Sequence, residues 1–291
     1  MNRRTDAIVT QTTNPFYRAL DLMTAKIRAV ANQKGGVGKT TSAINLGTSL
    51  AMAEQRVLLV DLDPQANLTS GVGLKGQTAA GGTIYQALTS EVEDVRQFVL
   101  NTSINGLALI PADRNLTGAE IDLVTLPHRE SRLRGCLDRL RGQFDYILID
   151  TPPSLGLLTL NALVAADAVL IPLNCEYFAL EGLADLVATL RRVRAAFNPG
   201  LDIAGVLMTM YDERTNLGQQ VSRDIRAFFQ DRVFDTVIPR NIRLGEAPSH
   251  GMPAILYDVK SRGAEAYLAL AREVLARDRN TPATTTEPQH G

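Results

Sequence analysis

The chain has 291 residues, of which 45% are hydrophobic, so it can bury one large core and is expected to form one domain, two at most. Its formal net charge of −1 excludes a chain that is basic throughout, so any DNA contact must come from a local patch. Cys136 and Cys175 lie far apart, which argues against a disulfide framework or a zinc site and suits a reducing cytoplasm. No apolar run approaches the ~20 residues of a membrane span.

The first part of the chain contains its most informative motif. Residues 1–25 are largely polar and lack the apolar core of a signal peptide, so a loosely ordered extension is expected. The apolar run 27–30 then predicts a short buried strand, and residues 42–51 have apolar side chains at helical spacing. Between them lies the sequence NQKGGVGKTT (32–41). A strand, a glycine-rich turn and a helix opening on Gly-Lys-Thr together indicate a phosphate-binding loop.

Such a loop binds phosphate through backbone N–H groups and the positive end of the helix dipole. Lys39 would place a charge on the β/γ-phosphates, and Thr40 would offer a hydroxyl to Mg²⁺. One position departs from the usual pattern, because Gln33 stands where glycine is expected and is followed by a second lysine, Lys34.

The remainder of the chain alternates between apolar runs and helical patterns. Strands are expected over 56–60, 107–111, 144–150, 168–173 and 203–210, and helices over 83–89, 91–99, 115–141, 178–196, 217–230 and 262–277. This alternation predicts an α/β protein with a single doubly wound, mainly parallel sheet covered by helices on both faces. Its ligand should lie beyond the carboxyl ends of the strands. The Thr- and Pro-rich residues 278–291 are expected to form a disordered tail.

Carboxylates follow two of the predicted strands. Asp150 ends one strand and fits Mg²⁺, which accepts one or two protein carboxylates and keeps several waters. Asp61 and Asp63 end another strand, two residues apart and on the same side. One of them could orient an attacking water, although either could instead cap the following helix. Phosphoryl transfer depends on positioning and charge neutralisation, so no nucleophilic side chain is required.

Several of these stretches together resemble one family. KGGVGKTT (34–41) is similar to the deviant Walker A motif of the ParA/MinD group of P-loop ATPases, DLDPQ (61–65) to its second signature, and DTPPS (150–154) to its Walker B motif. The stretches CEYFALEGL (175–183), MYDERTNL (210–217) and IPRNIRLGEAPS (238–249) resemble chromosomal ParA (Soj) proteins. The resemblance covers about residues 26–277 and implies a ParA-type P-loop ATPase domain that hydrolyses ATP.

The resemblance also implies which residues take part in catalysis. Lys34 would reach across a nucleotide-sandwiched homodimer to the partner's phosphates, as a charge supplied in trans, while Lys39 would act within its own loop. Asp63 would position the hydrolytic water. Mg²⁺ would be reached by Thr40, Asp61 and Asp150, the carboxylates acting through waters.

ATP or ADP would be bound by the loop and by a second segment near the base. The expected nucleotide contacts are Lys34, Gly35, Gly36, Val37, Gly38, Lys39, Thr40, Thr41, Pro239, Arg240 and Asn241.

The resemblance implies partners as well. The ATP-bound dimer would bind DNA without sequence preference, and a ParB-type centromere-binding protein would stimulate hydrolysis, driving chromosome or plasmid segregation on the nucleoid in the cytoplasm. The expected DNA contacts are Arg214, Arg223, Arg240, Arg243, Lys260 and Arg262, with salt-dependent affinity. Membrane docking is not expected, because the tail lacks an apolar face.

Two alternatives stay open at this point. The same chemistry could position a protein cargo, such as a carboxysome, a chemoreceptor array or a division site. The chain could also be a nucleotide-sensing DNA binder that hydrolyses ATP too slowly for turnover to matter.

Overall fold

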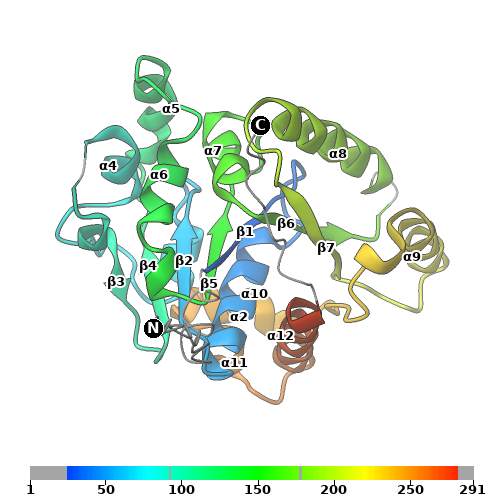
Figure 1. The fold of residues 1–291 in the computed structure, drawn as a ribbon. Coiled ribbons are helices and arrows are strands. Elements are labelled where there is room, and N and C mark those ends of the chain that lie inside the picture. The colour runs from blue at the N-terminus through cyan, green and yellow to red at the C-terminus, as the bar shows by residue number, and fades with distance from the viewer. Residues whose placement is uncertain (1–24, 92, 177–178, 281–291) are drawn as a thin grey trace, which may run out of the picture.

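A seven-stranded sheet forms the centre of the computed structural model, which describes residues 25–91, 93–176 and 179–280 (Figure 1). The strand order is β3-β4-β2-β5-β1-β6-β7. The strands are β1 (Lys26–Val30), β2 (Val57–Asp61), β3 (Leu100–Asn101), β4 (Leu107–Ile110), β5 (Tyr146–Asp150), β6 (Ala168–Asn174) and β7 (Asp202–Thr209). All neighbouring strands pair in parallel except β3, which is antiparallel to β4. The predicted doubly wound, mainly parallel fold is therefore confirmed.

Helices cover both faces of this sheet (Figure 1). One face carries α4 (Ile84–Thr89), α5 (Leu116–Val124), α6 (Arg132–Asp138), α7 (Leu157–Ala165), α8 (Ala179–Ala196) and α9 (Asn216–Phe229). The other carries α2 (Lys39–Met52), α3 (Asn67–Gly71), α10 (Ile242–Glu246), α11 (Ala254–Tyr257) and α12 (Arg262–Asn280). Short 3-10 turns are η1 (Val95–Phe98), η2 (Arg141–Gln143), η3 (Gln230–Arg232) and η4 (Ala247–His250).

The two faces explain why the strands appear as continuous apolar runs. On β2, Leu58 and Val60 pack into the core on the α4–α9 side, whereas Leu59 packs toward α2 and α12. Every side chain of such a strand is buried, so the sequence shows no polar alternation. Helix α2 approaches the sheet closely at Gly47, where an added Cβ would lie 2.7 Å from Cδ2 of Leu59.

Two predicted helices differ in the structure, and helix α7 has no predicted counterpart. The helix expected over 115–141 is split into α5, α6 and η2, with a break at His128, whose φ of 54° cannot continue an α-helix. The helix expected over 91–99 is reduced to the 3-10 turn η1. Helix α7 was missed because it is buried on nearly all sides and therefore has no polar face to produce a 3.6-residue period.

Helix α12 also ends later than predicted, at Asn280 rather than 277, because Asp278 is anchored to the sheet. Its carboxylate accepts hydrogen bonds from Arg28 of β1 and, at 2.7 Å, from the hydroxyl of Tyr146 of β5. Lys26 Nζ donates to its backbone carbonyl at 3.1 Å. The predicted extension and tail otherwise lie outside the described residues, since only residue 25 and residues 278–280 of them are described.

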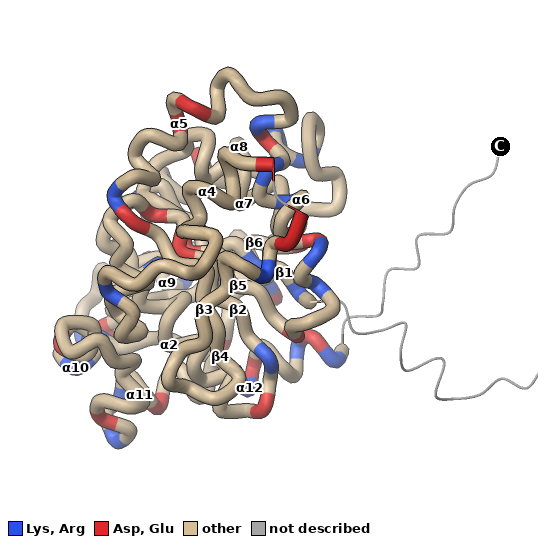
Figure 2. Tube along the Cα trace, turned by 90° about the vertical axis from the view of Figure 1, so that its left-hand side faces the viewer, with Lys and Arg blue, Asp and Glu red and all other residues tan. Residues whose placement is uncertain are grey.

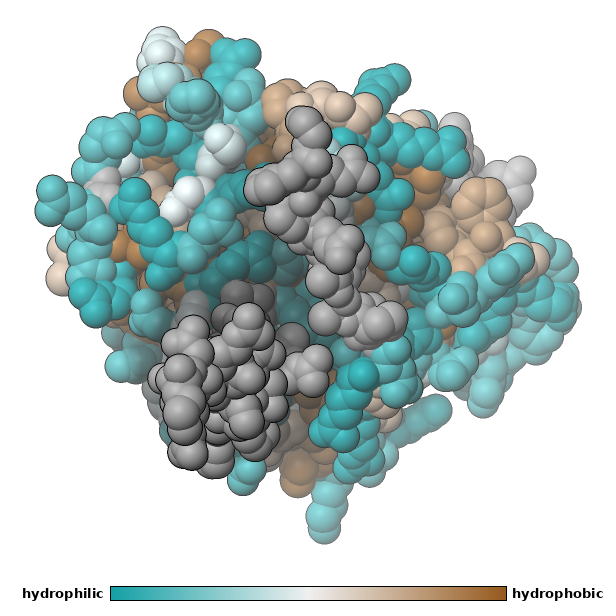
Figure 3. All heavy atoms as spheres, viewed as in Figure 1, coloured by the Kyte–Doolittle hydropathy of each residue, from teal (hydrophilic) through white to brown (hydrophobic). Residues whose placement is uncertain are grey.

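The face of the molecule in Figure 3 is mostly hydrophilic, with apolar side chains in small separate patches. Within the described residues, no helix combines the length and apolarity needed to cross a bilayer.

Replacing Asp278 should weaken the fold. We expect Asp278→Ala to lower the free energy of unfolding by about 3–5 kcal/mol, because Arg28 is only 7% exposed and would lose its carboxylate partner. Arg279→Ala, at an exposed neighbouring position, is the control and should change it by less than about 0.5 kcal/mol. Urea denaturation followed by circular dichroism measures both variants, and equal values would contradict the anchoring role.

Candidate functional site

A cavity of about 580 Å³ lies beyond the carboxyl ends of the central strands, where a doubly wound sheet binds its ligands. The phosphate-binding loop and the first turn of α2 form one wall, and the segment after residue 237 forms the other. The lining residues are Gly35, Gly36, Gly38, Lys39, Thr40, Thr41, Asp63, Gln65, Asn67, Pro153, Thr209, Met210, Ile238, Pro239, Arg240, Asn241, Leu244, Gly245 and Tyr267.

The glycines of the loop allow its tight turn. Gly36 and Gly38 have φ values of 71° and 86°, a left-handed conformation that glycine adopts without strain. Gly38 is the N-cap of α2, so the helix begins at Lys39 with its unpaired N–H groups at the cavity. Lys39 Nζ donates to the Lys34 carbonyl at 3.2 Å, and burial lowers the Lys39 pKa despite the nearby Asp150 and Asp63 carboxylates. These features make the wall an anion-binding surface.

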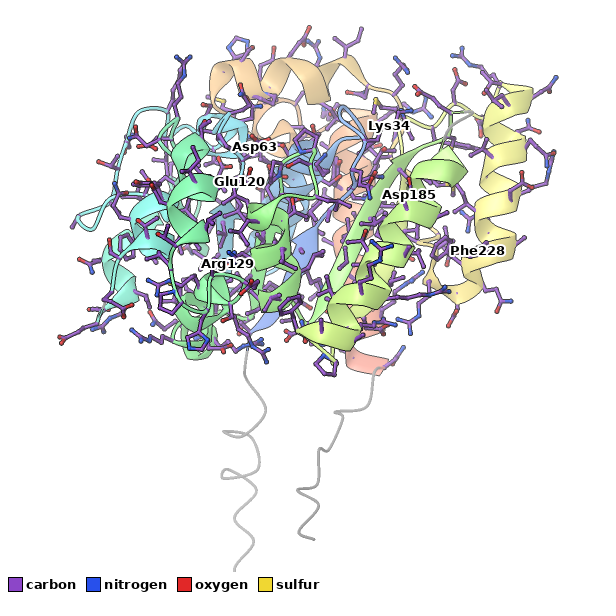
Figure 4. The ribbon with its side chains drawn as sticks, turned by 90° about the horizontal axis from the view of Figure 1, so that it is seen from above. Lys34, Asp63, Glu120, Arg129, Asp185 and Phe228 are labelled. Atoms are coloured by element: carbon purple, nitrogen blue, oxygen red, sulfur yellow. The ribbon has the colours of Figure 1, made fainter. Side chains whose placement is uncertain are left out.

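The two lysines of the loop point to different places. Lys39 lines the cavity, whereas Lys34 does not. Lys34 Nζ instead donates to Oε2 of Glu176 at 2.8 Å, and the two side chains are 35% and 54% exposed. Figure 4 shows Lys34 and Asp63 near the same edge of the molecule, on different loops. Val37 also lies outside the lining, because it is buried and its carbonyl accepts a hydrogen bond from Thr209 at 2.8 Å.

Asp63 lines the cavity from the loop after β2. Asp63 is 8% exposed, and its Oδ1 accepts a hydrogen bond from the Gln65 N–H at 2.9 Å. This turn holds the carboxylate at the cavity, close enough to Lys39 to affect that residue's pKa. The geometry is compatible with a carboxylate that accepts a hydrogen bond from a water molecule beside bound phosphate.

Asp61 and Asp150 lie beneath the cavity rather than in its lining. They are register partners at the ends of β2 and β5, and both are fully buried. Burial raises the Asp61 pKa to about 6, although hydrogen bonds from Thr69 offset part of this effect. Both oxygens of Asp61 accept hydrogen bonds, from Thr69 and from the Asp63 N–H.

The hydrogen bonding of Asp150 differs from that of Asp61. Neither of its buried carboxylate oxygens accepts a hydrogen bond from the described residues. Burial, followed by the Asp61 charge, raises its pKa well above the ordinary value, and the Thr40 hydroxyl offsets a smaller part. A buried carboxylate with so little compensation from its own chain fits a nearby cation. Mg²⁺ would be held here by Thr40 and Asp150, and it would neutralise charge on phosphate oxygens.

The second wall was only partly predicted. Pro239, Arg240 and Asn241, which were predicted to contact the nucleotide near its base, line the cavity. This segment is placed by the pairing of Tyr211 with Pro239, which extends the β7 edge of the sheet. Sequence patterns gave no signal for Tyr267 of α12, whose hydroxyl lies 3.0 Å from the Ser42 hydroxyl.

The six predicted DNA contacts are all exposed, and they lie in the β7–α9 loop, on α9, and around α10 to α12. Arg223 donates a hydrogen bond to Gln220 at 2.7 Å, and two others form ion pairs within the described part of the chain. Arg214 makes hydrogen bonds to Asp212 at 2.8 and 2.7 Å, and Arg243 contacts Glu246 at 2.7 Å and Asp258 at 3.3 Å. Basic and acidic residues accordingly alternate around α10 and α11 in Figure 2.

Comparison with known proteins decides the family. An AAA domain family model matches residues 25–203. The chain is 54% identical over 260 residues to the chromosome partitioning protein ParA of Caulobacter vibrioides, covering 89% of this chain and 97% of that protein. It is 54% identical over 251 residues to the sporulation initiation inhibitor protein Soj of Bacillus subtilis, covering 86% and 98%. The chain belongs to the ParA/Soj family of P-loop ATPases.

A solved structure supports the P-loop ATPase class. Cobyrinic acid a,c-diamide synthase from Mycobacterium smegmatis, with a bound ATP analogue and magnesium, superposes with a TM-score of 0.76 at 37% identity. The match covers 88% of this chain and 96% of that one. The predicted membership of the ParA/Soj family and the predicted ATPase class are therefore confirmed.

In the absence of Mg²⁺ and nucleotide, Asp150→Asn should raise the stability of the folded protein. Because its folded-state pKa is raised, ionisation of Asp150 costs stability as pH rises above its ordinary value of 3.8. The melting temperature should therefore rise by at least about 2 °C at pH 8 and by less at pH 4. Thermal scans at both values measure this, and ATP with Mg²⁺ should stabilise the wild type more than the variant. A melting temperature lower than that of the wild type at pH 8 would contradict the conclusion that the buried Asp150 carboxylate destabilises the protein when no cation is bound.

Proposed function

We propose that this protein is an ATP-dependent DNA-partitioning ATPase that alternates between a DNA-bound dimer and a free monomer. ATP and Mg²⁺ would bind in the cavity, and two copies would face each other across two nucleotides. The dimer would bind nucleoid DNA without sequence preference, and a ParB-type partner would stimulate hydrolysis. ParA/Soj membership supports the proposal, and the arrangement of the site makes its steps physically reasonable.

The chain's own residues would share the catalytic work. Lys39 and the N–H groups at the start of α2 would bind the β/γ-phosphates and stabilise negative charge as it develops. Thr40 and Asp150 would hold Mg²⁺. Asp63 would orient the attacking water, because its carboxylate lies at the cavity wall on a turn fixed by Gln65.

The observation that carries the dimer proposal is the position of Lys34. Its ammonium lies outside the cavity lining in an exposed ion pair with Glu176, while its backbone carbonyl accepts a hydrogen bond from Lys39 of that lining. An exposed pair of this kind contributes only about 0–1 kcal/mol, so exchanging Glu176 for another anion costs little. A phosphate held by a second copy is such an anion, and it would supply a stronger, more desolvated partner.

At the proposed DNA surface, phosphates would likewise replace carboxylates as the partners of basic side chains. Arg214 and Arg243 are exposed and paired with carboxylates of this chain, which would be replaced by DNA phosphates. Arg240 belongs both to the cavity lining and to the predicted DNA contacts. The proposed nucleotide and DNA sites therefore lie next to each other, which is suitable for a nucleotide-dependent DNA affinity.

Two variants separate dimerisation from hydrolysis. Lys34→Ala should abolish ATP-dependent dimerisation, because the trans charge is lost. Asp63→Ala should retain it and lower kcat by roughly 100-fold or more. Size-exclusion chromatography with light scattering, with ATP or ADP, and a phosphate-release assay provide the two readouts. Lys75→Ala, which removes an exposed lysine away from the cavity lining, is the control for Lys34. A wild type that stays monomeric with ATP and Mg²⁺ would overturn the dimer proposal.

DNA binding can be tested by pelleting with DNA-coated beads in ATP, ADP or no nucleotide. We expect ATP-dependent pelleting that Arg243→Ala weakens about tenfold, equivalent to about 1.4 kcal/mol for one charge-assisted contact. Affinity should fall steeply with salt and should not depend on DNA sequence. Arg279→Ala, at the opposite end of the strands, is the control. The DNA assignment fails if pelleting is the same in all three nucleotide conditions.

A further inference from the structure

The fully buried Asp61 connects the end of β2 to α3. Its Oδ2 accepts two hydrogen bonds from Thr69, from the backbone N–H at 2.8 Å and from the hydroxyl at 2.7 Å. Its Oδ1 accepts the Asp63 N–H at 3.2 Å. One carboxylate therefore holds both ends of the segment 63–69, which includes Asp63.

Thr69 extends this connection to the next strand. It is 2% exposed, and its hydroxyl oxygen accepts the Ala112 N–H at 3.1 Å while the hydroxyl proton is donated to Asp61. Ala112 follows β4, which pairs with β2 in the sheet. The loops after two neighbouring strands are thus joined through a single hydroxyl. A valine at position 69 would keep nearly the same volume and lose both of these hydrogen bonds.

Helix α3 is itself fixed by close packing. Gly71 lies against Ile44 of α2, where an added Cβ would come within 2.5 Å of Cδ1. Just beyond the helix, Gly73 lies against Gly251, and an added Cβ would lie 3.0 Å from the Gly251 carbonyl oxygen. Thr69 therefore belongs to a rigid element, so its bonds to Asp61 can transmit a defined position to Asp63.

We propose that Asp61 and Thr69 form a positioning pair that sets the orientation of Asp63 for hydrolysis. This inference rests on the proposed role of Asp63 in orienting the attacking water. It gives Asp61 a different role from the magnesium contact predicted from the sequence, because both Asp61 oxygens already accept hydrogen bonds within the chain. Displacement of a reacting group by about 1 Å can cost about 100-fold in rate, so the pair acts on kcat rather than on nucleotide binding.

The test compares Thr69→Val, Thr69→Ser and Thr48→Val. Thr48 is a fully buried threonine on α2 whose hydroxyl donates to the Ile44 carbonyl, so its replacement controls for loss of a buried hydrogen bond. We expect Thr69→Val to lower kcat about 10- to 100-fold, with KM for ATP and the ADP dissociation constant within about twofold. Thr69→Ser should restore kcat to within about threefold, and Thr48→Val should leave it unchanged.

A second variant and a double variant complete the design. Asp61→Asn provides the same comparison if Thr69→Val does not fold, and it should show the same loss in kcat at unchanged nucleotide affinity. The double variant Asp63→Ala/Thr69→Val should be no slower than Asp63→Ala alone, because the two residues act as one unit.

The results of these assays distinguish failure of the positioning role of Asp61 and Thr69 from failure of the proposed role of Asp63. Wild-type kcat in Thr69→Val, or equal losses in Thr69→Val and Thr69→Ser, would overturn the positioning role. In Asp61→Asn, a raised Mg²⁺ requirement with full kcat at saturating Mg²⁺ would also overturn it and assign Asp61 to the metal. Wild-type kcat in Asp63→Ala would instead reject the proposed role of Asp63.

Discussion

The arrangement of the site depends on two carboxylates placed side by side at the ends of paired strands. Asp61 and Asp150 are register partners, both fully buried, and the Asp61 charge adds to burial in raising the pKa of Asp150. Like charges at this spacing need separate compensation. Asp61 receives it from hydrogen bonds of Thr69 and Asp63, whereas Asp150 receives only the smaller effects of the Thr40 hydroxyl and the Lys39 charge. The first can therefore organise the loop, and the second is left for a cation.

Lys34 and Lys39 of the phosphate-binding loop also occupy different environments. Lys39 begins α2 and lines the cavity, so its position follows from the left-handed turn at Gly38. Lys34 lies five residues earlier on the same loop, yet its ammonium points to Glu176 outside the lining. The loop thus directs one lysine to the cavity and another to its surroundings, which is the arrangement that the proposed nucleotide-sharing dimer requires.

Much of the fold could be predicted because its signals are local. Buried parallel strands give unbroken apolar runs, and a helix opening on Gly-Lys-Thr after a strand has few other uses. The errors have physical causes as well. Helix α7 is buried around most of its circumference, and the predicted helix over 115–141 is interrupted by the left-handed His128. Helix α12 continues past the predicted end because Arg28 and Tyr146 hold Asp278, a contact between distant residues.

For the site, the sequence by itself determined the chemistry of the phosphate wall: the loop, Lys39, Thr40 and the strand-end carboxylates. These follow from spacing along a strand, a turn and a helix, which local geometry controls. Only the tertiary structure decided which carboxylate is already engaged and that Tyr267 completes the cavity. Such contacts depend on how strands and helices far apart in the chain are brought together, so no local pattern can record them.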